Sequence, residues 1–157
     1  MINYPKFKEN LSVVRARVAR ACEVSGRAES TVSLLPVTKN HPLEAIDYAV
    51  RSGLMAVGEN RVQEASDKRG SSTDKMRWEL IGHLQSNKAQ DAVATFDRIQ
   101  SVDSIKLVRR LDRFAGEQGK KLAILLQCNT GKEPNKYGFA EEELPSVLEA
   151  ALKMPNL

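Results

Sequence analysis

The chain has 157 residues, of which 41% are hydrophobic and 28% charged, and its formal net charge is +4. This composition predicts one globular domain with a sizeable core. It argues against a membrane protein, because no stretch approaches the roughly 20 apolar residues that span a bilayer. It also argues against a nucleic-acid partner, because Lys and Arg are interspersed with Asp and Glu instead of forming a basic run.

Two further features concern the cellular compartment. The polar N-terminal segment "MINYPKFKEN" shows no secretory signal pattern, so the cytoplasm is the expected location. Cys22 and Cys128 match no metal or redox spacing, which favours two buried thiols over a disulfide.

The first predicted element is an amphipathic helix from Pro5 to about Gly26. Its apolar residues recur three or four positions apart, at Leu11, Val14, Val18 and Cys22. Five β-α units follow, each a short apolar run and then a helical pattern. The expected strands are 31–37, 55–59, 78–82, 98–102 and 121–129, and the expected helices are 42–53, 60–70, 86–96, 104–119 and 141–153. Ser86 and Ser104 are the expected N-caps of two of these helices.

Alternating strands and helices predict parallel strands with right-handed crossovers, in either a doubly wound sheet or a barrel. In both architectures, ligands bind at the C-terminal ends of the strands. The run "GSST", 70–73, precedes a strand and is therefore expected to be a flexible connection rather than a phosphate site. Nine polar or charged residues do fall at the expected ligand-binding edge: Lys39, Glu59, Asn60, His83, Gln85, Asn87, Asp103, Asn129 and Lys136.

Taken singly, these residues have simpler explanations. Lys39, which follows the run "LLPV" and precedes a proline, could be a solvated loop lysine. His83 could be satisfied by the backbone. Asn60 and Asn87 could serve the free backbone donors at helix starts.

Other kinds of site lack their sequence signatures. The two histidines and two cysteines have no zinc-ligand spacing, and neither a glycine-rich phosphate motif nor a serine nucleophile elbow is present. Glu59 could simply pair with Lys39 or Arg61. What remains is a sheet edge that carries lysine, histidine and amide side chains.

Five segments, in order, resemble the YggS/PROSC family of pyridoxal-phosphate-binding proteins, which are implicated in vitamin B6 homeostasis. The segments are "LLPVTKNHPLEAI", "GLMAVGENRVQEA", "WELIGHLQSNK", "IQSVDSIKL" and "LLQCNTGKEPNKYGF". The resemblance implies a TIM-barrel-type fold like the N-terminal domain of alanine racemase. It also implies that pyridoxal phosphate (PLP) is held as an aldimine by Lys39, and that Asn60, His83 and Asn87 bind the cofactor from the same pocket.

The proposed chemistry requires a neutral amine, because only the neutral form attacks an aldehyde. A reactive Lys39 is therefore expected to be partly desolvated or to lie near another cation. Lys136 and His83 are the candidate neighbours. By the resemblance, the chain is a homeostasis protein rather than an enzyme. An alanine-racemase-like PLP enzyme, which would need a second base, and an unrelated phosphosugar-type barrel enzyme are the alternatives.

Two departures from the family pattern lead to further expectations. Glu79 stands where the family commonly has histidine. The sequence covers one domain, 1–157, with a leading helix and five of eight β/α units, and lacks the later segment that holds the cofactor phosphate in the family. PLP binding by these residues is thus expected to be weak or absent. Five strands cannot close an eight-stranded barrel, so self-association through exposed strand edges is expected.

Overall fold

The computed structural model describes residues 3–72 and 76–157. Four parallel strands form one sheet in the order β1-β2-β3-β4. They are β1 (Ala56–Glu59), β2 (Arg77–Leu80), β3 (Arg98–Val102) and β4 (Ala123–Leu126). Each strand lies beside the next strand in the sequence, so the order never reverses as it does in a doubly wound sheet. The fold is therefore α/β of the barrel type, and the described strands form part of a barrel.

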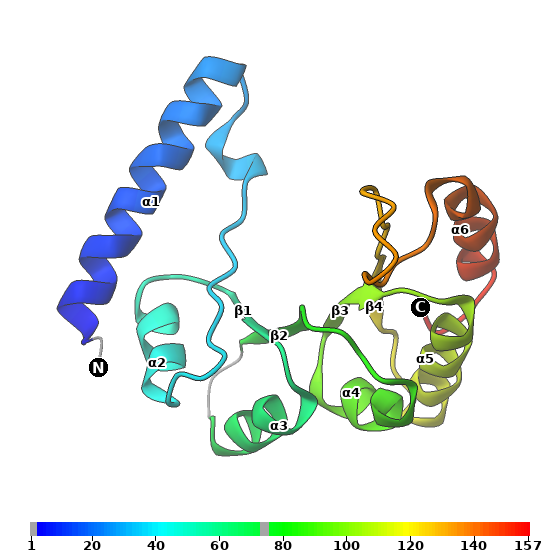
Figure 1. Ribbon diagram of the computed structural model, residues 1–157. Coiled ribbons are helices and arrows are strands. Elements are labelled where there is room, and N and C mark those ends of the chain that lie inside the picture. The colour runs from blue at the N-terminus through cyan, green and yellow to red at the C-terminus, as the bar shows by residue number, and fades with distance from the viewer. Residues whose placement is uncertain (1–2, 73–75) are drawn as a thin grey trace.

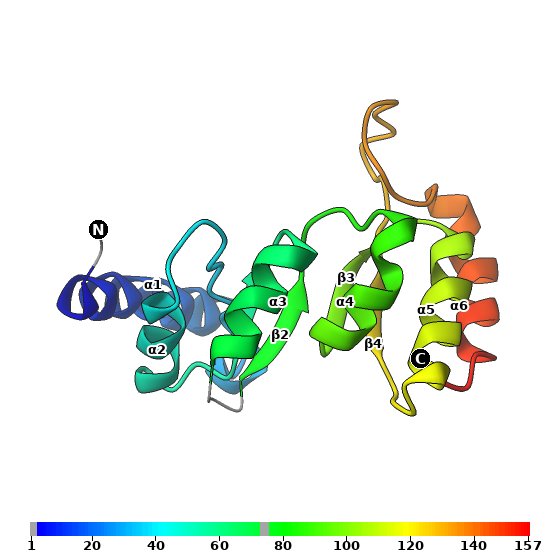
Figure 2. The ribbon, with the colours of Figure 1, turned by 90° about the horizontal axis from the view of Figure 1, so that it is seen from below.

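Helices cover the outer side of this curved sheet, as Figure 1 shows. They are α2 (Glu44–Arg51), α3 (Val62–Ser71), α4 (Ala89–Thr95), α5 (Ile105–Glu117) and α6 (Leu144–Leu152). Figure 2 shows α3 and α4 in front of the strands and α5 beside them. The core contains large side chains from strands and helices alike, including Ile46, Trp78, Leu80, Phe96, Ile99, Leu107 and Leu111.

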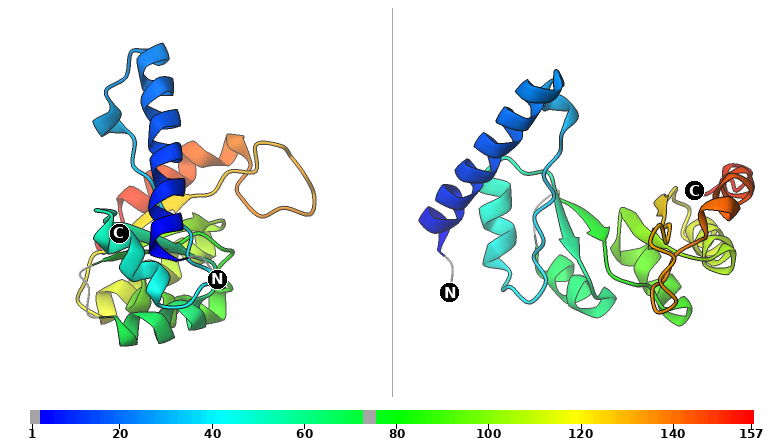
Figure 3. Two further views of the ribbon diagram at one scale, coloured as in Figure 1. Left: turned by 90° about the vertical axis from the view of Figure 1, so that its left-hand side faces the viewer. Right: turned by 45° about the horizontal axis from the view of Figure 1, so that its top comes forward.

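The leading helix α1 (Tyr4–Ser25) has nearly the expected bounds. The side chain of Asn3 accepts a hydrogen bond from the Lys6 N–H at 3.0 Å. Gly26 ends the helix at φ 66°, a left-handed conformation that glycine adopts without steric cost. Figure 3 shows α1 extending away from the sheet.

The apolar stripe of α1 is less buried than expected. Cys22 is buried, but Val14 is 42% exposed. The reason is that α1 packs against α2 and against the short 3-10 helix η1 (Glu29–Thr31) instead of the sheet. Its contacts with α2 include aromatic ones, which join Tyr48 to Tyr4 and Phe7, with ring centroids 5.6 and 6.0 Å apart. Cys22 and the half-buried Cys128 are both free thiols.

The strand expected at 31–37 is largely absent, which corrects the sequence-based prediction. Only Val37 forms an isolated parallel bridge, with Gly58 of β1. The Gly58 N–H donates to the Pro36 carbonyl at 2.8 Å, and the Thr38 N–H donates to the Gly58 carbonyl at 3.0 Å. Pro36 has no N–H of its own, so the run cannot sustain a continuous hydrogen-bond ladder.

Helix starts were predicted with mixed success. Ser104 is the N-cap of α5, where its side chain accepts from the Leu107 N–H at 3.3 Å. Ser86, by contrast, lies inside the 3-10 helix η2 (Ser86–Lys88) and makes no capping bond to α4. The 3-10 helix η3 (Glu141–Glu143) precedes α6 and takes up its expected acidic first turn.

The remaining differences are small. β4 begins and ends inside the expected strand 121–129. In the "GSST" run, Gly70 and Ser71 end α3 and Ser72 follows, whereas Thr73 lies outside the described residues. Within the described ranges, no helix combines the length and the apolar character needed to cross a bilayer.

Candidate functional site

Lys39 lies in a turn beside the C-terminal end of β1. The turn begins directly after the bridge to Gly58, and the His41 N–H closes it by donating to the Thr38 carbonyl at 3.1 Å. Asn40 adopts φ 59°, in the left-handed region that asparagine tolerates better than most residues. The Lys39 side chain is exposed, and no carboxylate pairs with its amine in residues 3–72 and 76–157. The predicted position at the sheet edge is therefore confirmed, but the expected desolvation is not.

The buried carboxylate of Glu59 lies next to this turn. Glu59 is the last residue of β1 and is completely buried. Its Oε1 accepts hydrogen bonds from the Thr38 hydroxyl and from Nζ of Lys68, both at 2.7 Å. The expected pairing of Glu59 with Lys39 or Arg61 is wrong, because Lys68 reaches it from α3.

Lys68 also holds the turn itself. Its Nζ donates to the Thr38 carbonyl and to Oε1 of Glu64, both at 2.8 Å. The same Glu64 oxygen accepts from the Asn40 N–H at 2.6 Å. The backbone is thus fixed on both sides of Lys39.

The charges in this network stabilise one another. Partial burial lowers the pKa of Lys68, but the hydrogen bonds and charges of Glu59 and Glu64 outweigh it and raise the pKa above the ordinary 10.5. For Glu64 the largest influence is the hydrogen bond from Lys68, and it brings the pKa below 4.5 although slight burial opposes it. Lys68 is therefore an ammonium and Glu64 a carboxylate at neutral pH.

Sequence reasoning did not identify Lys68 or Glu64. The available signal was their spacing, since a Glu four residues before a Lys on a helix is a favourable pair. That spacing usually marks an exposed helix face. Only the structure shows that the Lys68 side chain is 11% exposed.

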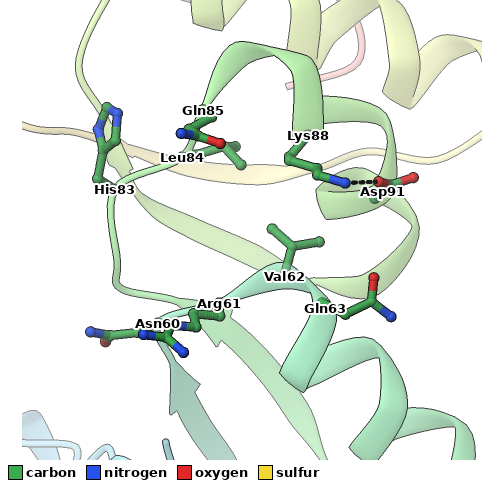
Figure 4. A pocket seen from close by; sticks show the side chains of 9 residues that line it. All are labelled: Asn60, Arg61, Val62, Gln63, His83, Leu84, Gln85, Lys88 and Asp91. Carbon is green, nitrogen blue, oxygen red and sulfur yellow. Dashed lines mark ion pairs between the residues drawn. The ribbon is translucent and has the colours of Figure 1, made fainter.

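Asn60 and His83 line one pocket of about 350 Å³. It lies between the start of α3 and the segment that leads through η2 into α4, and Figure 4 shows the two side chains on the same side of it. The segments that follow β1 and β2 approach closely here. A Cβ on Gly82 would lie 2.3 Å from the Asn60 carbonyl oxygen, so only glycine fits. Lys39 and Asn87 do not line this pocket.

The imidazole of His83 contacts the side chains of Asp103 and Tyr137. Its Nδ1 lies 3.0 Å from Oδ2 of Asp103, which follows β3. Its ring stacks on Tyr137, with centroids 3.6 Å apart and an interplanar angle of 11°. These contacts join the end of β2 to the end of β3 and to the loop after β4.

The other expected roles are revised as follows. Lys136, a candidate neighbour of Lys39, pairs with Glu133 at 2.5 Å. The N-cap of α3 is Arg61, not Asn60, and it makes no side-chain cap. Asn87 lies within η2. In the part of the chain that the structure describes, no three His, Cys, Asp or Glu side chains come together as a metal site.

Comparisons with known proteins agree on one family. The model of the alanine racemase N-terminal domain matches residues 2–157. A pyridoxal phosphate homeostasis protein from Pseudomonas aeruginosa is 38% identical over 150 residues, which cover 95% of this chain and 65% of that protein. The chain thus spans about two thirds of the length of such relatives.

Solved structures support the same relationship. PipY from Synechococcus elongatus, with PLP bound, is 37% identical, with a TM-score of 0.72 over 88% of this chain and 65% of PipY. An alanine racemase from Clostridium difficile is 14% identical, with a TM-score of 0.69 over 80% of this chain and 33% of the racemase, and it shares the fold. The expected barrel-type architecture is confirmed.

Proposed function

We propose that this chain binds PLP through Lys39. The premise is that the chain belongs to the alanine racemase N-terminal domain family and, within it, to the pyridoxal phosphate homeostasis proteins. The observation that carries the proposal is the exposed amine of Lys39, which pairs with no carboxylate of the described residues, on a turn whose backbone is held on both sides. The PLP-bound state of the related PipY supports the choice of ligand.

The residues fit an aldehyde ligand. A primary amine at the end of a parallel strand can condense with the aldehyde carbon of PLP, so that a C=N bond replaces C=O and one water is released. Bound in this way, PLP supplies an electron-withdrawing ring. Asn60 and His83 are proposed to contact the ligand beyond this bond, because both belong to a pocket at the same edge of the sheet. Asn87, on the next short helix, is proposed as a more distant contact.

The proposed role is to hold and supply PLP, without catalysis of a further reaction. The names of the relatives, which describe homeostasis, support this role. Racemisation would need a second base on the opposite face of the ligand. The same proposal includes one incomplete PLP-binding domain over residues 1–157, PLP as the partner, and no nucleic acid or membrane partner. It also includes residence in the cytoplasm, for which the two free thiols are suited.

A labelling experiment tests the proposal. The chain is incubated with PLP, its visible spectrum is recorded, and the product is reduced with borohydride and mapped by mass spectrometry. We expect the label on Lys39 and its loss in Lys39→Ala, with unchanged folding because an exposed residue contributes little packing. Lys106→Ala, which removes an exposed lysine from α5, is the matched control and keeps the label. A label on Lys88 or Lys136 with Lys39 unmodified would contradict the assignment, and turnover of L-alanine to D-alanine would contradict the non-catalytic role.

Two expectations about these 157 residues remain predictions. One is weaker PLP binding than that of the longer relatives. The other is self-association through the edge of β4, which pairs only with β3 among the described strands and exposes 48% of Leu125. Light scattering tests the second: Leu125→Lys should reduce the associated fraction, and a chain that is monomeric before substitution would refute it.

A further inference from the structure

We infer that Glu59, Glu64 and Lys68 form a positioning device, here called the Lys68 clamp, which fixes the direction in which Lys39 presents its amine. The inference rests on the proposed function and deepens it, because it assigns the three residues a role toward the same ligand. None of them is expected to touch PLP. They would act through the backbone of the Lys39 turn.

The clamp holds both peptide groups of Lys39. The peptide before its Cα carries the Thr38 carbonyl, which accepts from Lys68 at 2.8 Å. The peptide after its Cα carries the Asn40 N–H, which donates to Glu64 at 2.6 Å. Each peptide group is planar, so holding both leaves the backbone at Lys39 little freedom to rotate. The Cα–Cβ bond of Lys39 therefore points in one direction.

The clamp is anchored in the core. Glu59 ends β1, is completely buried and binds Lys68 at 2.7 Å. Glu64 and Lys68 lie four residues apart on α3, so their side chains share one helix face. A strand and a helix thus support the turn together, which holds a reactive group more rigidly than a loop alone would.

Lys68 and Lys39 have opposite properties. An ammonium group has three N–H donors, and those of Lys68 go to three acceptors: the Thr38 carbonyl, Glu59 and Glu64. Its raised pKa keeps it protonated, so it has no lone pair for attack on an aldehyde. Lys39 has no such partner among the described residues. The structure therefore separates the lysine that positions from the lysine that reacts.

Such positioning matters for rate, because a displacement of about 1 Å at a reacting group can slow a reaction by about 100-fold. The proposal is tested with Lys68→Met, which keeps the apolar stem and removes all three donors, and with Lys68→Arg as a conservative replacement. Lys153→Met is the matched control, because Lys153 also pairs with a Glu four residues earlier, Glu149, but is 72% exposed.

Two readouts are combined. Amide hydrogen exchange at Asn40 reports whether the turn is held, without any ligand. The rate at which borohydride traps PLP on Lys39 reports whether the amine is well placed. We expect Lys68→Met to accelerate Asn40 exchange and to slow trapping, each by about 10-fold. Lys68→Arg should restore part of both, and Lys153→Met should change neither.

The outcomes separate the clamp from the proposed function. If the unsubstituted chain does not react with PLP, the proposed function fails. The Lys68 clamp is then tested by amide exchange at Asn40 and by trapping with pyridoxal, which lacks the phosphate. If Lys68→Met does not fold by circular dichroism, Glu64→Ala, which removes only the partly exposed end of the clamp, replaces it with the same expected direction. Unchanged trapping despite faster exchange would overturn the positioning role, and unchanged exchange would overturn the clamp itself.

Discussion

Two lysine-containing loops at the same edge of the sheet are held in contrasting ways. The turn of Lys39 is fixed by Lys68, whose side chain is 11% exposed, and by the completely buried Glu59. The loop 127–139, which Figure 3 shows extending away from the body of the protein, contains a pair between Lys136 and Glu133 whose side chains are 63% and 54% exposed. The N–O distances are similar, at 2.7 and 2.5 Å.

The difference teaches that the N–O distance does not determine how much each ion pair contributes to stability. An exposed pair contributes about 0–1 kcal/mol, because water screens the charges and ordering two long side chains costs entropy. Removing one partner of a buried pair leaves the other charge without compensation and costs about 3–5 kcal/mol. The Lys39 turn should therefore be a fixed part of the fold, and the Lys136–Glu133 pair a part that can be changed with little effect.

The largest effect is expected from Glu59→Ala. The substitution removes a buried carboxylate, leaves a cavity and takes one acceptor from Lys68. The free energy of unfolding should fall by about 3 kcal/mol, the lower end of the range for buried pairs, because Glu64 still pairs with Lys68. Urea denaturation measures the change, and Glu133→Ala is the control from the exposed pair. A loss below about 1 kcal/mol would show that burial does not set the ranking.

Much of this architecture could be predicted from the sequence. The alternation of apolar runs and helical patterns gave the parallel order, β3 has its predicted bounds, and the serine at 104 caps α5 as expected. These features depend on local periodicity and capping chemistry. The position of Lys39 at the sheet edge follows from the same rules, because every strand of a parallel sheet ends on one side.

The clamp could not be predicted, because it depends on tertiary contacts. The partners of Glu59 lie 9 and 21 residues away, and sequence neighbours such as Arg61 were equally plausible. The strand expected at 31–37 failed because a single proline interrupts its hydrogen bonds. Local pattern identifies which residues reach the edge of the sheet, but not which of them bind one another.

A pH series on Glu64→Gln would sharpen the comparison. The pKa of Glu64 lies below 4.5 in the folded chain because of the hydrogen bond from Lys68. The contribution of ionised Glu64 to the free energy of unfolding is therefore present above pH 4.5 and is lost as the pH falls through the folded pKa. The pKa of Lys68 is raised above 10.5, so its contribution persists across the acidic and neutral range. The unfolding free energies of the unsubstituted chain and of Glu64→Gln should differ by about 1 kcal/mol at neutral pH, a value that allows for solvent screening.

The difference between Glu64→Gln and the unsubstituted chain should stay constant from about pH 5 to 8 and shrink below pH 4.5. Thermal unfolding at each pH measures it. A difference that grows on acidification would show that Glu64 is not stabilised as a carboxylate.

An effect of similar size is expected from the stacked rings that hold the loop 127–139. Tyr137→Ala removes the ring that packs on His83 at 3.6 Å. The free energy of unfolding should fall by about 1 kcal/mol, because Tyr137 is 59% exposed and only its stacked face contributes. Limited proteolysis within the loop should become faster, whereas Tyr137→Phe, which keeps the ring, should behave like the unsubstituted chain. Equal cleavage rates for Tyr137→Ala and Tyr137→Phe would show that the stack does not restrain the loop.

The smallest effect is expected from Glu133→Gln. This substitution removes the charge opposite Lys136 and keeps the size of the side chain, and the Glu133 backbone can still accept from the Asn129 side chain, as it does at 2.9 Å. Because both charged groups are more than half exposed, the unfolding free energy should change by no more than about 0.5 kcal/mol. Any residual effect should vanish in 1 M salt, where the screening length falls to about 3 Å. Urea denaturation at low and high salt measures both quantities. A salt-insensitive loss as large as that of Glu59→Ala would mean that the exposed pair is as important as the buried one, and the contrast between the two loops would then have to be explained by something other than burial.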